Sequence, residues 1–208
     1  MTKLVSLKYK NEAALIEGCR KQKQLAQQEL FTIYHKKMMG ICVRYLRDEE
    51  EAFEVLNDAF LKIFDKIDQF KPETKLEAWI RRIVVNTTID HIRKNKSYKK
   101  NFIRTDEFIT YGVPSDDDSI SEFWDKACSI PEEVFLCLVN ELPPATRVVF
   151  NLYAIDEYNH RQIAKQLTIS EGTSKWHLSN ARQQLKEKLI KIINKGTYQN
   201  ESREFKKY

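Results

Sequence analysis

The sequence predicts an all-α protein with two helical domains joined by a flexible linker, the second domain carrying a helix-turn-helix. Three observations lead to this fold class. The 208 residues include only five Gly and five Pro, so few positions interrupt a helix. Apolar residues recur at steps of three and four over long stretches, as in amphipathic helices. Residues 97–130 lack this period and contain a run of three aspartates.

The first predicted domain, residues 1–96, contains three long helical patterns, which run over 24–46, 48–70 and about 75–96. Asp48 is placed to cap the second helix. The acidic residues that follow it suit the positive N-terminal end of the helix dipole. A break at Lys71-Pro72-Glu73 separates the second pattern from the third. The domain is therefore expected to be a small helical bundle.

The second predicted domain spans residues 131–195, and a polar tail, 196–208, follows it. Pro131 suits the first turn of a new helix. Helical patterns over 132–141 and 144–155 precede a final pair of helices. The acidic linker, 97–130, separates this domain from the first.

Two helices joined by a tight turn are predicted between Tyr158 and Leu185. Asn159 and Ser170 are suitable N-caps for the first and second helix. The apolar stripe of the first helix comprises Ile163, Ala164 and Leu167, and that of the second comprises Leu178, Ala181, Leu185 and Leu189. This is the arrangement of a helix-turn-helix.

The second helix of this pair is expected to present polar groups opposite its apolar stripe. On a helical wheel that side carries Thr173, Trp176, Ser179, Asn180 and Gln183, flanked by Lys175 and Arg182. A helix in the major groove needs donors and acceptors that reach base edges. Arg161 and Lys165, on the first helix, suit contacts with phosphates. The alternative is an ordinary helical hairpin with a solvated face, and an outward-facing Trp disfavours it.

A second polar stripe lies on the helix predicted over 75–96. Its members, at steps of three and four, are Trp79, Arg82, Asn86, Asp90 and Arg93. An aromatic ring can stack on an unpaired base, which contributes about 1–3 kcal/mol per base, and an amide can read an extruded base. Lys94 and the lysines after it suit duplex phosphates. The alternative is that Trp79 is a core side chain and Asn86 a buried structural amide.

The charge of the chain, +5 in total, is unevenly distributed. Nine basic residues lie between Lys75 and Arg104, and eight lie between Arg161 and Lys195. Nine acidic residues lie between Asp106 and Glu133. Two basic blocks separated by an acidic one indicate two contacts with a single polyanion.

An enzyme is disfavoured because the sequence offers no catalytic or metal-ligating cluster. The four cysteines form no CxxC pair and are expected to be reduced thiols. The four histidines show no metal-like spacing with carboxylates. Asp116–Asp118 lie in the predicted linker and not on facing helices. We therefore expect no cofactor, no metal and no small-molecule substrate.

A cytoplasmic protein is expected, one that is not itself inserted in a membrane. Met1–Lys10 has no apolar run long enough for a signal peptide. No stretch of the sequence is apolar enough for a transmembrane helix.

Three blocks of the chain together resemble bacterial RNA polymerase sigma factors, especially the extracytoplasmic-function (ECF) subfamily. They are Asp58–Phe64, Ala78–Arg93 and Glu141–Phe150, the last leading into the helix-turn-helix. The resemblance covers roughly Ala26–Leu189. It implies a factor, without enzymatic activity, that binds core RNA polymerase and directs promoter recognition, DNA melting and transcription initiation. It also implies an anti-sigma factor as a partner.

The resemblance assigns roles to particular residues. Glu54, Asn57 and Asp58 match the polymerase-binding stretch. The loop Phe70–Thr74, which includes Lys71 and Thr74, and Asn86 match the pocket for a flipped base of the minus-ten element. Lys175, Trp176, Ser179 and Asn180 match the positions that meet the minus-thirty-five element.

Two residues depart from the family pattern. Thr168 stands in the turn where the family usually has Gly, so a strained or differently wound turn is expected. Trp176 stands where a small or basic residue is more usual. A different class of DNA-binding protein is the alternative: a stand-alone helix-turn-helix regulator, which would bind its site without polymerase and usually as a symmetric dimer.

Overall fold

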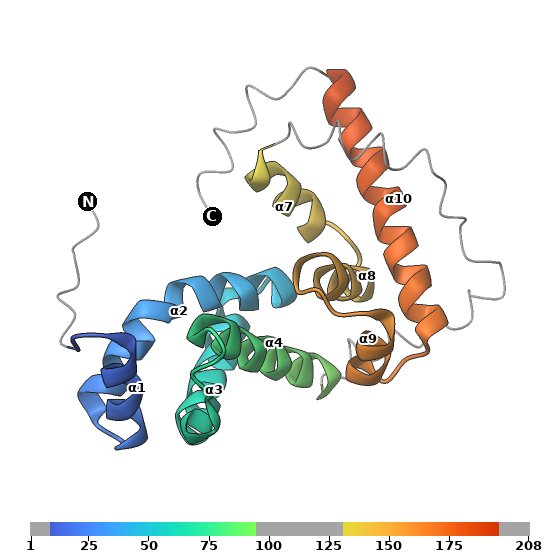
Figure 1. Cartoon of the computed structure of the whole chain (residues 1–208). Helices are drawn as coiled ribbons and strands as arrows, with labels where there is room; N and C mark the ends of the chain where they lie inside the picture. Colours follow the sequence, from blue (N-terminus) through green and yellow to red (C-terminus); the bar gives the residue numbers. More distant parts are fainter. Residues whose placement is uncertain (1–8, 95–130, 196–208) are drawn as a thin grey trace. The chain divides into compact units, whose positions relative to one another are not determined.

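The computed structural model describes residues 9–94 and 131–195, and every secondary-structure element in those ranges is helical (Figure 1). The all-α prediction is therefore confirmed for the described chain. The chain divides between Lys94 and Asn95 into two compact units. The predicted linker, 97–130, and the predicted tail, 196–208, lie outside the described residues.

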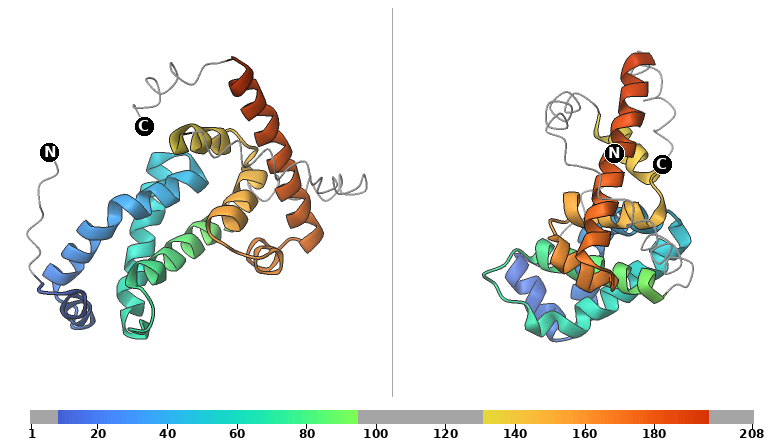
Figure 2. Two further views of the ribbon diagram at one scale, coloured as in Figure 1. Left: turned by 45° about the horizontal axis from the view of Figure 1, so that its top comes forward. Right: turned by 90° about the vertical axis from the view of Figure 1, so that its right-hand side faces the viewer.

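The first unit is a bundle whose helices are α1 (Glu12–Arg20), α2 (Gln24–Leu46), α3 (Glu49–Lys66) and α4 (Leu76–Lys94), with the short 3-10 helix η1 (Ile67–Gln69) after α3. Helices α2, α3 and α4 pack on one another in all three pairings (Figure 2). Their shared core includes Leu30, Tyr45, Ile63 and Ile80, each no more than 2% exposed. The three long helical patterns of the sequence are these three helices.

Helix α3 begins as its sequence predicts. The Asp48 carboxylate accepts a hydrogen bond from the Glu51 backbone N–H at 2.8 Å, and Glu49, Glu50 and Glu51 occupy the first turn. The α-helix ends at Lys66, and η1 occupies the last residues of the predicted 48–70 segment.

Helix α1 is absent from the sequence-based prediction because its buried side carries only three apolar residues, Leu15, Ile16 and Cys19, together with Gly18, which lowers helix propensity. Asn11 caps it, accepting from the Ala14 N–H at 2.8 Å. Gly18 lets α1 approach α2 closely: a Cβ at this position would lie 2.7 Å from the Cβ of Ala26. Packing against α2 therefore stabilises a helix too short to be stable alone.

The second unit is formed by α7 (Glu132–Asn140), α8 (Pro144–Phe150), the π-helical η3 (Asn151–Ile155), α9 (His160–Leu167) and α10 (Glu171–Lys195). The long helix α10 packs against α7, α8 and α9 (Figure 2). Its core side is the predicted stripe, with Leu178, Ala181, Leu185 and Leu189 buried.

Two features of this unit were not predicted. The segment predicted as one helix over 144–155 changes to π-helical winding at Asn151, and the Asp156 N–H bonds the Asn151 carbonyl five residues back at 3.0 Å. Arg147, 2% exposed, donates to the carbonyls of Asn140 and Leu142. This buried guanidinium thereby fixes the corner between α7 and α8.

Candidate nucleic-acid interface

The first helix of the helix-turn-helix, α9, is defined by strong signals at both ends. Asn159 and Gln162 form a reciprocal capping box, each side chain bonding the other's backbone N–H at 2.9 Å. At the other end, Thr168 has φ 58° and ψ 47°, and its N–H bonds the Ala164 carbonyl. Thr168 therefore adopts the left-handed backbone conformation that glycine usually occupies at this point of a turn. A Cβ-bearing residue there costs roughly 1–2 kcal/mol, so the expected strain is present.

The second helix, α10, begins at the predicted cap. The Ser170 hydroxyl oxygen accepts from the Thr173 N–H at 2.9 Å and lies 2.7 Å from the Thr173 hydroxyl. The wheel placed Thr173 on the outward side, and for this residue that expectation is wrong because Thr173 is 0% exposed. Its hydroxyl lies against the capping Ser170 hydroxyl and is not available to a ligand.

Two histidines, which the sequence analysis did not identify, fix the orientation of α10. The Nδ1 of His160, on α9, lies 2.9 Å from the buried Ser174 hydroxyl, and its ring stacks on Tyr153 at 4.6 Å. The Nδ1 of His177 lies 3.0 Å from the Thr146 hydroxyl of α8. Both links join side chains that are distant in sequence, so no helical period could indicate them.

The other residues of α10 that were predicted to contact DNA are accessible to a ligand. Lys175 is exposed, and Trp176, Ser179, Asn180 and Arg182 are partly exposed. The Trp176 ring meets the His177 ring edge-on at 5.2 Å, and the Asn180 side-chain oxygen accepts from Gln184 at 3.1 Å. Arg161 and Lys165 are exposed on α9. The helix pair therefore presents cationic, amide, hydroxyl and indole groups together.

The predicted stripe on α4 of the first unit is partly accessible. Arg82, Arg93 and Lys94 are exposed, and Trp79, Asn86 and Asp90 are partly exposed. Asp90 accepts from the Arg93 guanidinium at 2.9 Å. The Trp79 ring meets the buried Phe70 ring edge-on at 5.5 Å. Trp79 is thus partly a packing residue, as the alternative reading held, and partly a surface residue.

The loop from Phe70 to Thr74 forms a short turn beside this stripe. The Lys71 carbonyl accepts from both the backbone N–H and the hydroxyl of Thr74, at 3.1 and 2.9 Å. The side chains of Lys71 and Thr74 are exposed. The turn is therefore ordered by its own hydrogen bonds while its outer surface stays open.

One face of α3 carries both the expected acidic and amide groups and two exposed apolar side chains. Glu54 and Asp58 are exposed and Asn57 is partly exposed. Phe53 and Leu61, four residues before and after Asn57, are 53% and 62% exposed. Residues four apart share a helix face, so the two apolar side chains extend this polar group. Their exposure could not be predicted from the sequence, because apolar residues at helical spacing are normally expected in a core.

The three cysteine thiols in the described residues all have a raised pKa. Burial raises the pKa of the Cys19 and Cys42 thiols to about 11. Burial, and to a lesser extent the charge of Glu141, raises the pKa of Cys137.

Within residues 9–94 and 131–195, no group of three His, Cys, Asp or Glu side chains could hold a metal ion. In the same residues, no helix has the length and apolarity needed to span a membrane.

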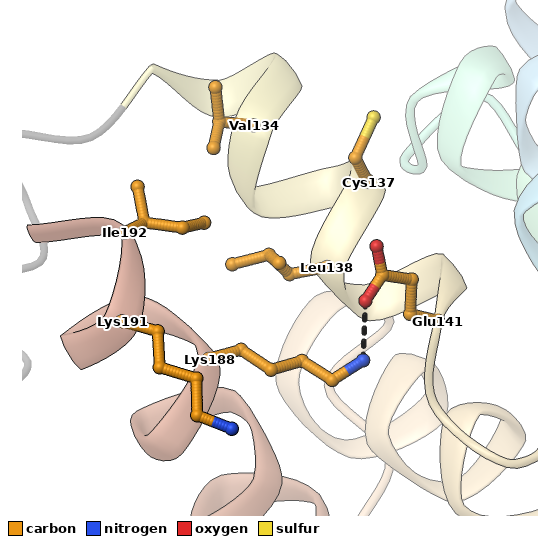
Figure 3. A pocket seen from close by; sticks show the side chains of 7 residues that line it. All are labelled: Val134, Cys137, Leu138, Glu141, Lys188, Lys191 and Ile192. Carbon is orange, nitrogen blue, oxygen red and sulfur yellow. Dashed lines mark hydrogen bonds and ion pairs between the residues drawn. The ribbon is translucent and has the colours of Figure 1, made fainter. Parts of the chain in front are cut away.

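A groove of about 250 Å³ lies between α7 and the C-terminal part of α10, and its lining residues on α10 are Lys188, Lys191 and Ile192 (Figure 3). Val134, Leu138 and Ile192 provide apolar walls, and Lys188 donates to Glu141 across one end. Cys137 lies on the α7 side.

The fold and its exposed groups define a two-unit helix-turn-helix protein of the DNA-binding class. The family models for Sigma-70 region 2 and Sigma-70 region 4 match residues 30–98 and 132–185. Together they match more than half of the chain, which therefore belongs to the sigma-70 family of RNA polymerase sigma factors.

Similar proteins of known identity are ECF sigma factors. The chain is 28% identical over 183 residues to the ECF RNA polymerase sigma factor SigW of Bacillus subtilis, covering 84% of this chain and 94% of that protein. It is 23% identical over 197 residues to the ECF RNA polymerase sigma-E factor of Escherichia coli K12, covering 88% and 97%. The predicted ECF resemblance is thereby confirmed.

Solved structures similar to this one include the sigma factor RpoE of Bartonella quintana in complex with the anti-sigma factor NepR. That match has 19% identity and a TM-score of 0.44, covering 79% of this chain and 96% of that one. CnrH, solved with the cytosolic domain of CnrY, matches with 18% identity and a TM-score of 0.43, covering 85% and 95%.

Proposed function

We propose that this protein, as an ECF-type sigma factor, binds core RNA polymerase and directs it to promoters through two DNA contacts, one in each helical unit. The observation that carries the proposal is the family match: region 2 falls on the unit with the α4 stripe, and region 4 falls on the unit with the helix-turn-helix. The mechanism requires only differential binding, because a factor that binds melted DNA more tightly than duplex shifts the equilibrium toward melting.

The helix-turn-helix unit is proposed to read the minus-thirty-five element as duplex. Lys175, Trp176, Ser179 and Asn180 would face base edges or the adjacent backbone, and Arg182 would flank them. Arg161 and Lys165, on α9, would hold phosphates, which position a protein without specifying sequence. Thr173 is not proposed to contact DNA, because its side chain is buried at the N-terminal cap of α10. Its proposed role is to start α10.

The α4 unit is proposed to capture the melted minus-ten element. Asn86 would read a flipped base, and Trp79, already supported on one edge by Phe70, would stack on a neighbouring base. Arg82, Arg93 and Lys94 would hold the backbone, with Asp90 orienting Arg93 through their ion pair. Lys71 and Thr74 would contribute from the ordered turn.

The α3 face is proposed to dock on core polymerase. Glu54, Asn57 and Asp58 offer carboxylate and amide oxygens, and Phe53 and Leu61 offer exposed apolar surface on the same face. Such a mixture of apolar and polar groups is typical of protein interfaces. We further propose that the protein acts in the cytoplasm, where RNA polymerase works, and that an anti-sigma factor inhibits it. The proposed domain boundaries are those predicted from the sequence: 1–96, 97–130, 131–195 and 196–208. The proposed function involves no catalytic residue, cofactor or metal.

Transcription in vitro tests this function directly. Purified protein and core polymerase are incubated with a library of source-genome fragments, and the transcript starts are sequenced. Starts that require the added protein and share two upstream boxes support the proposal. Absence of specific starts on every template would overturn it. Gel shifts with and without core polymerase separate it from the stand-alone regulator, which would bind its site without polymerase.

A further inference from the structure

Arg20, in the last turn of α1, contacts the loop that follows η1, the short helix that packs against α1. Its guanidinium Nη2 donates to the backbone carbonyl of Phe70 at 3.0 Å. Its Nε lies 3.9 Å from the exposed Asp68 carboxylate. A hydrogen bond from a charged donor is stronger than one between neutral groups, whereas an ion pair with an exposed partner contributes little. The Phe70 carbonyl is therefore the principal partner of Arg20.

The helix that carries Arg20 is itself firmly docked. Leu15, Ile16 and Cys19 are buried, and at Gly18 the helix lies too close to Ala26 for any side chain to fit unchanged. The backbone N–H groups of Lys21 and Gln22 bond back into the helix end. Arg20 thus extends from a fixed support. This helix lies before residue 30, where the region 2 match begins.

Phe70, the residue that Arg20 holds, has two connections to the proposed minus-ten site. Its ring packs edge-on against Trp79 at 5.5 Å. Its carbonyl is the last backbone group before the turn in which Lys71 accepts both bonds from Thr74. The internal bonds of that turn fix its shape but not its direction relative to α4. An anchor at Phe70 supplies that direction.

We propose that Arg20 is a positioning residue for capture of the unpaired minus-ten strand. It holds the Phe70 carbonyl so that the Lys71–Thr74 turn and the Trp79 ring are aligned for a single-stranded ligand before that ligand arrives. Preorganisation of this kind lowers the entropy lost on binding. The inference rests on the proposed function of this unit and names a residue that does not itself touch DNA.

The test compares Arg20→Met with Lys21→Met, the same kind of change on the adjacent, exposed C-cap side chain, whose ion pair is a local one with Glu17. The first measurement is hydrogen–deuterium exchange of the free full-length protein. Arg20→Met is expected to raise exchange at residues 70–74 severalfold while α3 and α4 keep wild-type exchange. Lys21→Met is expected to leave exchange at 70–74 unchanged.

The second measurement uses holoenzyme on a promoter mapped by the transcription experiment. Losing a charged hydrogen bond that orders the site is expected to weaken binding of the single-stranded minus-ten oligonucleotide about tenfold, with affinity for core polymerase unchanged. Arg20→Lys, which retains the positive charge and a donating ammonium group but lacks the planar guanidinium, is expected to recover part of the loss. It also serves as the informative variant if Arg20→Met fails to fold.

Three results would overturn the inference: unchanged exchange at 70–74 in Arg20→Met, equal oligonucleotide binding by Arg20→Met and Lys21→Met, or equal loss of oligonucleotide and core polymerase binding. The exchange measurement needs no promoter. If wild-type holoenzyme initiates nowhere, the proposed function fails, and the link between Arg20 and the loop is still judged by exchange.

Discussion

The Nδ1 of His160 lies 2.9 Å from the hydroxyl of Ser174, and this bond joins the two helices of the helix-turn-helix. Ser174 is fully buried, and the His160 ring is stacked on Tyr153. The bond therefore fixes α10 relative to α9. The direction in which Trp176 and Ser179 face follows from that orientation.

Ser174→Ala is expected to lower the free energy of unfolding of the second unit by about 1 kcal/mol, because it removes one partner of a buried hydrogen bond. The urea midpoint for unfolding of the helix-turn-helix unit measures it. Ser179→Ala, on the partly exposed side of the same helix, is the control, with an expected change under about 0.5 kcal/mol. Equal midpoints for the two variants would show that the His160–Ser174 bond does not stabilise the unit.

Trp176→Ala and Lys175→Met are expected to affect minus-thirty-five recognition in different ways. Loss of the indole should reduce discrimination against a mismatched box by about 1 kcal/mol, since each specific base contact is of that order. Loss of the ammonium should weaken binding to all sequences alike and reduce the salt slope by about 1. Holoenzyme binding to matched and mismatched promoters over a range of salt concentrations separates the effects. A uniform loss in Trp176→Ala would contradict a role in reading bases.

Asn86→Ala is expected to impair promoter opening while core polymerase binding stays intact, because a melted base would lose its hydrogen-bonding partner. Permanganate reactivity of unpaired thymines measures opening, and a pull-down with core polymerase measures assembly. Gln28→Ala, an exposed amide on α2, is the matched control. Equal loss of opening and assembly in Asn86→Ala would instead indicate that this amide supports the fold.

Thr168→Gly is expected to stabilise the second unit by about 0.5–1 kcal/mol. Glycine relieves the left-handed strain at φ 58°, and part of this gain is offset by the greater freedom of glycine in the unfolded chain. Thr168→Ala retains a Cβ and is expected to change stability much less. The urea midpoints of the two variants measure the difference. A glycine variant no more stable than the alanine variant would mean that the turn carries no strain.

The parts of the fold that were predicted well from the sequence depend on interactions between residues close together in the chain. The helical period of 24–46 coincides with α2, and the caps at Asp48, Asn159 and Ser170 are present. Helix α1 was missed because its buried side carries few apolar residues and includes Gly18, which lowers helix propensity. The π-helical turn after Phe150 was missed because it differs from an α-helix only in how far back its hydrogen bonds reach.

In the candidate site, too, features set by nearby residues were predicted and features set by tertiary packing were not. The wheel indicated that Trp176, Ser179, Asn180 and Gln183 share an outer face with Lys175 on its flank, and all five are at least partly exposed. It failed at Thr173 because a wheel treats every residue as mid-helix, whereas this one lies in the first turn with its hydroxyl beside the capping Ser170. Phe53 and Leu61 were overlooked because only the packed bundle shows which apolar side chains remain outside it.

The sequence by itself determined the helical class, the two basic regions, the main caps and the sigma-factor resemblance, because periodicity, capping and motif spacing are properties of nearby residues. Only the tertiary structure decided that Arg20 reaches Phe70, fifty residues away, and that His177 meets Thr146. Those contacts depend on how helices cross in three dimensions. The crossing is set by the packing of whole side-chain surfaces, which no local pattern specifies.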